Sequence, residues 1–143
     1  MKDKLLFYLN ADFTHFTLAH FLQQKHDCEI YAIIDITNKP KEFFLKQKLV
    51  NFKKIWFVHD HVNLENDTVD LEYLKKIEDE FGIDLWKIII NDRIFYRFFN
   101  FHKFTRNELL SITEQLTKKF LGILNDIKPD FFISQQPALF HSE

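Results

Sequence analysis

A long amphipathic segment near the end of the chain restricts the possible folds more than any other feature. Thr105 and Glu108 have the spacing of a capping box, and apolar residues recur three and four apart from there to Ile127, which predicts a helix over residues 105–128. Pro129 ends this helix and predicts extended geometry at Lys128. The apolar run 131–134 that follows predicts a buried strand. A helix leading into a strand is half of a βαβ unit, so other segments should supply strands that this helix covers.

Further apolar runs alternate with helical stretches along the rest of the chain. Strands are predicted over residues 4–10, 29–35, 54–58, 86–90 and 131–134, and further helices over 16–25, 40–50 and 69–81, the last with Gly82 as its stop. This alternation predicts an α/β fold, namely a Rossmann-like, doubly wound parallel sheet of about five strands with helices on both faces. The length of 143 residues fits a single domain, 1–143. Residues 137–143 look like the start of another helix, so we expect this domain to be the N-terminal part of a longer chain.

Composition excludes several classes of protein. A net charge of −2 argues against a nucleic-acid-binding protein, which normally carries a basic excess. The single cysteine, Cys28, cannot form an intramolecular disulfide and is predicted to be a buried structural thiol in a reducing compartment. The apolar run 5–9 is too short for a signal peptide or a membrane span. We therefore predict a cytoplasmic protein.

Candidate site residues follow from the predicted topology. Ligands of open α/β sheets bind beyond the carboxyl ends of the strands, where the strand order reverses. With the order 3-2-1-4-5, this crevice would lie between the first and fourth strands. The predicted catalytic residues are Asp12 and His15, either of which can accept a proton from a hydroxyl group. The predicted substrate-binding residues are Asn10, Thr14, Asn91, Asp92, Arg93, Ser134 and Gln135, with Gln136 beside them.

Simpler interpretations exist for the residues after the first strand. Asp12 or Thr14 could cap the following helix, and His15 could be a polar surface residue. The loop contains no glycine, because the only two glycines are Gly82 and Gly122. Tight binding of a dinucleotide or a nucleotide at this turn is therefore not expected, and we predict no cofactor.

His59, Asp60 and His61 form a motif that could bind a transition metal. In an extended stretch the two histidines would share a face while Asp60 pointed away, and no third ligand is evident. We therefore predict a solvated loop and no metal site.

The segment 91–104 combines aromatic residues with positive charges. Arg93 or Arg97 could pair with a phosphate or carboxylate, the segment could lie on a membrane surface, or its phenylalanines could fill the core. Residues 39–54 also carry an excess of lysines, which suits a solvated face or an anionic membrane surface. A peripheral contact with the inner face of the membrane is thus one of the expectations.

The order of these parts resembles the N-terminal domain of GT-B glycosyltransferases, and most closely that of capsular and surface polysaccharide biosynthesis proteins. The resemblance rests on the polar loop after the first strand, on Asn91-Asp92-Arg93, and on the helix that ends Ile127-Lys128-Pro129-Asp130 before the last strand. It covers the whole chain in layout, although the glycine-rich first loop of many members is absent here.

This resemblance implies an acceptor-side domain that is inactive alone. Its partners would be a sugar acceptor and a nucleotide-sugar donor, the donor being held mainly by a C-terminal domain that these 143 residues lack. A different hypothesis is a non-catalytic α/β binding module that docks a partner or small ligand through the aromatic segment 95–104.

Overall fold

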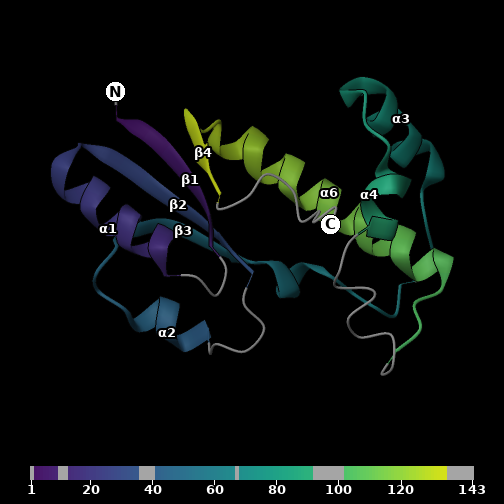
Figure 1. Cartoon of the computed structure of the whole chain (residues 1–143), viewed down its shortest axis with the longest axis horizontal. Coiled ribbons are helices and arrows are strands. Elements are labelled where there is room, and N and C mark those ends of the chain that lie inside the picture. Colours follow the sequence, from purple (N-terminus) through teal and green to yellow (C-terminus); the bar gives the residue numbers. More distant parts are fainter. Residues whose placement is uncertain (1, 10–12, 36–40, 67, 92–101, 135–143) are drawn as a thin grey trace. The chain divides into compact units, whose positions relative to one another are not determined.

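The computed structural model describes residues 2–9, 13–35, 41–66, 68–91 and 102–134 (Figure 1). Contacts divide the chain into two compact units. The first comprises the described residues of Met1–His61 and Leu121–Gln135, and the second those of Val62–Phe120. The helix α6 (Arg106–Ile127) contributes to both units. Within the described ranges, no helix combines the length and the apolar character needed to cross a bilayer.

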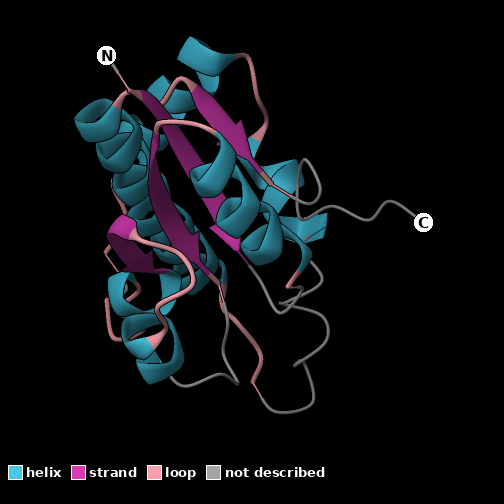
Figure 2. Ribbon diagram, turned by 90° about the vertical axis from the view of Figure 1, so that its left-hand side faces the viewer, coloured by secondary structure: helices cyan, strands magenta, loops and turns pink. Residues whose placement is uncertain are grey.

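The first unit contains a four-stranded, all-parallel sheet, whose strands are seen side by side in Figure 2. Its strands are β1 (Asp3–Leu9), β2 (Cys28–Ile34), β3 (Phe52–Phe57) and β4 (Phe131–Ile133), in the order β3-β2-β1-β4. The prediction of an α/β fold with a parallel sheet is confirmed. Four of the five predicted strands exist. Apolar runs of β-favouring residues suit a sheet that is buried on both faces, and β1 and β2 are mostly buried in this way.

The hydrophobic core lies on both faces of β1. Leu6 and Phe7 are neighbours in a strand and therefore point to opposite faces, and both side chains are fully buried. On the Phe7 face, Phe16 of α1 (Thr14–Lys25) and Phe44 of α2 (Lys41–Lys46) complete the cluster. Cys28 at the start of β2 is half-buried rather than buried, and its partial burial raises the pKa of the thiol.

The helix α2 ends four residues earlier than predicted. The side chain of Gln47 accepts hydrogen bonds from the backbone N–H groups of Leu49 and Val50, both at 2.9 Å, and donates one to the Val50 carbonyl at 2.8 Å. These bonds offer the backbone a turn in place of a further helical turn.

The start of β1 is tied to the chain that enters β4. The Lys4 backbone N–H donates to the Asp130 carboxylate at 2.8 Å, the Asp130 N–H donates to the Lys4 carbonyl at 2.9 Å, and the Lys4 ammonium bonds the Ile127 carbonyl at 3.0 Å. Lys128 has a φ of 49° and not the extended geometry predicted for a residue before proline. Left-handed geometry directly after a helix is a common way of ending it.

The strand β4 is exposed, although the sequence predicted a buried strand. Phe131 and Phe132 are 57% and 55% exposed. Among the described residues, β4 pairs only with β1, so it forms an edge of the sheet and does not lie in its middle.

The second unit is helical. It contains α3 (Leu71–Phe81), α4 (Leu85–Asn91) and the first part of α6. Asp70 caps α3 by accepting a hydrogen bond from the Tyr73 N–H at 2.9 Å, and Gly82 ends it at a φ of 65°, as predicted for that glycine.

The predicted strand 86–90 is wrong, because these residues lie in α4. Asp84 precedes the helix and accepts a hydrogen bond from the Lys87 N–H at 2.9 Å, so it acts as an N-cap. Leu85 and Ile89, four residues apart, are buried, while Trp86 and Lys87 are exposed. A helix with one buried face explains an apolar run of this length as well as a strand buried on both faces does.

The capping box of α6 is present as predicted. Glu108 accepts a hydrogen bond from the Thr105 N–H at 2.6 Å, and the Thr105 hydroxyl accepts one from the Glu108 N–H at 3.2 Å. The backbone and side-chain hydrogen bonds of Thr105, followed by the charge of His102, lower the pKa of Glu108. Glu108 therefore stabilises the folded state above its unfolded pKa, and this contribution is lost as the pH falls through the folded value.

We expect Glu108→Gln to lower the free energy of unfolding at neutral pH, with the difference from wild type shrinking as the pH falls to about 3. Glutamine can still reach back to the cap, so this change isolates the charge. Thr105→Ala removes the cap itself and should cost about 1 kcal/mol at either pH. Urea unfolding at the two pH values measures both. A Glu108→Gln difference that does not depend on pH would contradict the prediction.

Candidate functional site

Polar side chains gather at the carboxyl ends of β1, β2 and β3. Tyr8 is the penultimate residue of β1, Asp35 follows β2, and His59 lies in the short 3₁₀ helix η1 (Val58–His61) that follows β3. Parallel strands bring these three positions to the same edge of the sheet, the edge beyond which ligands of open parallel sheets bind, while the strand order itself reverses between β1 and β4. All three residues belong to the first unit.

Asp35 connects the other two side chains. The Tyr8 hydroxyl donates a hydrogen bond of 2.6 Å to Asp35 Oδ2, and His59 Nε2 lies 3.5 Å from Asp35 Oδ1. The Asp35 backbone N–H also donates to the Leu9 carbonyl at 2.8 Å, which continues the β1–β2 pairing by one residue. The carboxylate is therefore held from its backbone as well as from its side chain.

The group is accessible from solvent. The side chains of Asp35 and His59 are 25% and 44% exposed. An ionised carboxylate has about four lone-pair sites, so Asp35 can accept hydrogen bonds beyond the one from Tyr8. His59 Nε2 faces Asp35, and 44% of the His59 side chain is exposed to solvent. The arrangement can bind hydroxyl groups and can accept a proton from one.

The prediction for the His59-Asp60-His61 motif assumed an extended backbone. These residues instead lie in the short 3₁₀ helix η1. Two residues of the motif have different partners, because His59 faces Asp35 while Asp60 pairs with Lys41. Asp60 forms an ion pair with Lys41, whose ammonium lies 5.4 Å from the centre of the Phe57 ring. In the described part of the chain no three His, Cys, Asp or Glu residues lie close enough together to hold a metal ion.

The predicted residues near β1 and β4 are only partly described. Thr14 and His15 are the first residues of α1, the helix that follows β1 in the chain, and Ser134 follows β4, which pairs with β1. Of these three residues, Ser134 directly follows a strand, and the other two begin a helix. Thr14 and Ser134 both have interaction partners. Asn10, Asp12 and Gln135 lie outside the described residues.

The predicted residues after 86–90 do not follow a strand. Asn91 is the last residue of α4, and its side-chain amide donates to the Lys87 carbonyl at 2.7 Å. It belongs to the second unit and not to the sheet. Asp92, Arg93 and residues 95–101 of the predicted aromatic docking segment lie outside the described residues.

The prediction did not group Tyr8, Asp35 and His59 as a candidate site. A usable signal was present, because Asp35 is the first polar residue after an apolar strand. The connection to Tyr8 depends on the sheet register, in which Tyr8 is opposite Ile33. That register could not be read from the sequence.

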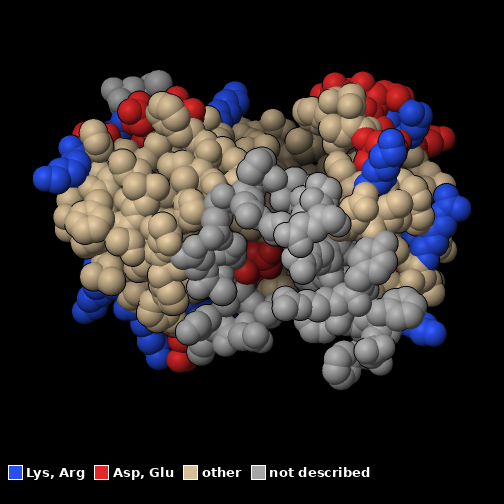
Figure 3. Space-filling model, viewed as in Figure 1, with Lys and Arg blue, Asp and Glu red and all other residues tan. Residues whose placement is uncertain are grey.

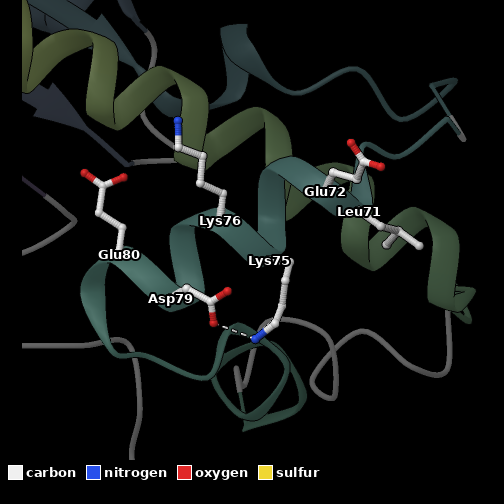
Figure 4. A pocket seen from close by; sticks show the side chains of 6 residues that line it. All are labelled: Leu71, Glu72, Lys75, Lys76, Asp79 and Glu80. Carbon is white, nitrogen blue, oxygen red and sulfur yellow. Dashed lines mark hydrogen bonds and ion pairs between the residues drawn. The ribbon is translucent and has the colours of Figure 1, made fainter.

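A surface hollow of about 780 Å³ lies elsewhere, along α3 (Figure 4). Its lining residues all belong to this one helix: Leu71, Glu72, Lys75, Lys76, Asp79 and Glu80. Lys75 donates a hydrogen bond of 2.7 Å to Asp79, which raises the pKa of the lysine. Carboxylates and ammonium groups are mixed along this solvated helix face, as is usual for an exposed helix surface, and they do not converge on one point as the groups of a binding site would.

No model of a protein family matches the sequence, and neither a curated protein nor a solved structure matches the chain.

Proposed function

We propose that the chain is the acceptor-side, N-terminal domain of a GT-B glycosyltransferase of capsular or surface polysaccharide biosynthesis. Its described sheet would be the larger part of a Rossmann-like, doubly wound fold. The proposal is supported by the layout resemblance and by the position of β4, which follows the long helix α6 and pairs with the first strand.

The observation that carries the proposal is the carboxylate of Asp35 between the Tyr8 hydroxyl and the His59 ring. A sugar acceptor presents several hydroxyl groups and apolar ring faces. A carboxylate with spare lone pairs, next to an aromatic side chain, is suited to both features. The position at the carboxyl edge of the parallel sheet is where an acceptor would be expected.

In this proposal His59 joins Asp12 and His15 as a candidate base. His59 would take the proton from an acceptor hydroxyl as its oxygen attacks the anomeric carbon of the donor and the nucleotide leaves. Asp35 would position the imidazole and stabilise its protonated form, while Tyr8 orients Asp35. The donor would be bound mainly by the second domain of the enzyme.

The test is saccharide binding by the chain itself. We expect saturable binding of at least one saccharide from a panel of neutral, amino and uronic sugars, measured by ligand-observed NMR, and no saturable binding of UDP. Asp35→Asn should weaken saccharide binding at least about tenfold, because a hydrogen bond to a charged group contributes about 1.5–3 kcal/mol. His59→Gln should weaken it as well.

Two matched variants control for non-specific effects of these substitutions. Asp79→Asn on α3 and His26→Gln, at the exposed residue after α1, make the same chemical changes away from the site. Both should bind the saccharide like the wild type. Absence of saturable binding across the panel, or unchanged binding by Asp35→Asn, would overturn the proposal.

A further inference from the structure

The helix α2 and the turn after it expose several large apolar side chains to solvent. Between residues 41 and 50 only Phe44 and Val50 are buried. Phe43, Leu45 and Leu49 are 40%, 65% and 56% exposed, and the Phe13 ring, also exposed, lies 5.9 Å from that of Phe43. A hollow of about 420 Å³ is lined by Glu42, Phe43, Lys46 and Gln47.

The turn that carries Leu49 is held in place by hydrogen bonds. The Leu49 carbonyl accepts hydrogen bonds from His20, at 2.7 Å, and from Gln23 of α1. The Leu49 N–H donates to Gln47, and Gln23 accepts a hydrogen bond of 2.9 Å from the Asn51 N–H. The turn is therefore attached to α1 through a backbone carbonyl, that of Leu49, and a backbone N–H, that of Asn51. These bonds hold Leu49 in its exposed position.

Two exposed lysines lie among these apolar residues in the sequence, Lys46 at the end of α2 and Lys48 in the turn after it. In the described part of the chain the ion-pair partner of Lys46 is Glu42, at 3.3 Å, and both side chains are more than 70% exposed, so the attraction between them is weak. No ion pair of Lys48 occurs among the described residues. Residues 39–54 contain a single acidic residue, Glu42, and six lysines. Of these lysines, Lys41 pairs with Asp60 and Lys53 with Glu29, and Lys54 lies over the Trp56 ring, so Lys46 and Lys48 are the ones available to this face among the described residues. Figure 3 shows a mainly uncharged surface over α1 and α2, with Lys and Arg side chains, and some Asp and Glu side chains, along its margin.

We propose that this α2 face, formed by Phe13, Phe43, Leu45, Lys46, Lys48 and Leu49, docks on an anionic lipid bilayer. Exposed phenylalanine and leucine side chains can enter the acyl boundary, while the adjacent ammonium groups contact negative headgroups. Apolar insertion and electrostatic attraction together determine the strength of such a peripheral contact. A second copy of the chain is a poorer occupant, because two such faces would bring lysines against lysines. This inference does not depend on the proposed glycosyltransferase function.

The test is co-sedimentation of the chain with vesicles. We expect binding to phosphatidylcholine vesicles that contain about 30% phosphatidylglycerol, weak binding to pure phosphatidylcholine, and release by high salt. Lys46→Gln/Lys48→Gln should weaken binding about 25-fold, because each lysine near an anionic surface contributes about 1 kcal/mol. Phe43→Ser/Leu45→Ser should weaken it at least about tenfold, since part of each apolar side chain would no longer be buried.

The helix α3 offers matched controls. Lys75→Gln/Lys76→Gln removes two exposed lysines there, and Phe81→Ser removes a phenylalanine that is 52% exposed. Both should bind vesicles like the wild type. Equal binding to neutral and anionic vesicles, no binding to either, or equal loss in the α3 variants would overturn the proposal. So would a concentration-dependent dimer that Phe43→Ser abolishes while vesicle binding is unchanged.

Discussion

Replacing Phe7 with alanine should lower the free energy of unfolding of the first unit by about 3–5 kcal/mol. Phe7 lies in the middle of β1, between two parallel neighbours, and its side chain is fully buried. Truncation would remove the transfer energy of the ring and leave a cavity. The surrounding sheet cannot close it readily, because β1 is hydrogen-bonded on both sides.

The two tryptophans allow each unit to be followed separately. Trp56 is in β3 of the first unit, and Trp86 is in α4 of the second. In a Trp86→Phe background, urea unfolding followed by fluorescence therefore reports on the sheet. Phe21→Ala is the matched control, because Phe21 in α1 is 54% exposed and should cost less than about 1 kcal/mol. Equal losses for Phe7→Ala and Phe21→Ala would show that β1 is not the centre of the core.

Four strands and the long helix could be predicted because their signals are local. An apolar run bounded by polar residues identifies β1 and β2, and the pair Thr105 and Glu108 identifies the start of α6. The exposure of Phe131 and Phe132 could not be predicted in this way. It depends on which strand pairs with β4, and that is a property of the sheet as a whole.

The candidate site was less accessible to sequence reasoning. Topological reasoning directed attention to the carboxyl ends of the strands; Ser134 directly follows β4, whereas Thr14 and His15 are the first residues of α1. The contact between Tyr8 and Asp35, in contrast, joins residues 27 positions apart. This contact results from the register of β1 against β2, which cannot be deduced from the spacing of residues along the chain.

The residues 86–90 show why an apolar run alone does not distinguish a strand from a helix. The prediction expected a strand buried on both faces, in which Ile88, Ile89 and Ile90 would all be in the core. In α4 only Ile89 of these three is buried, while the other two are half-buried. Asp84 decides the outcome locally, because its side chain supplies a partner for a backbone N–H that a helix start leaves unpaired.

Ile89→Ala should therefore lower the free energy of unfolding of the second unit by about 2–5 kcal/mol, whereas Ile88→Ala should cost less than half as much. The two changes remove the same atoms, so the difference isolates burial. Trp86 fluorescence in a Trp56→Phe background reports on the unit, since the Trp86 ring lies 5.6 Å from the Arg106 guanidinium of α6. A strand buried on both faces would make the two losses similar, and such a result would contradict the helical assignment of α4.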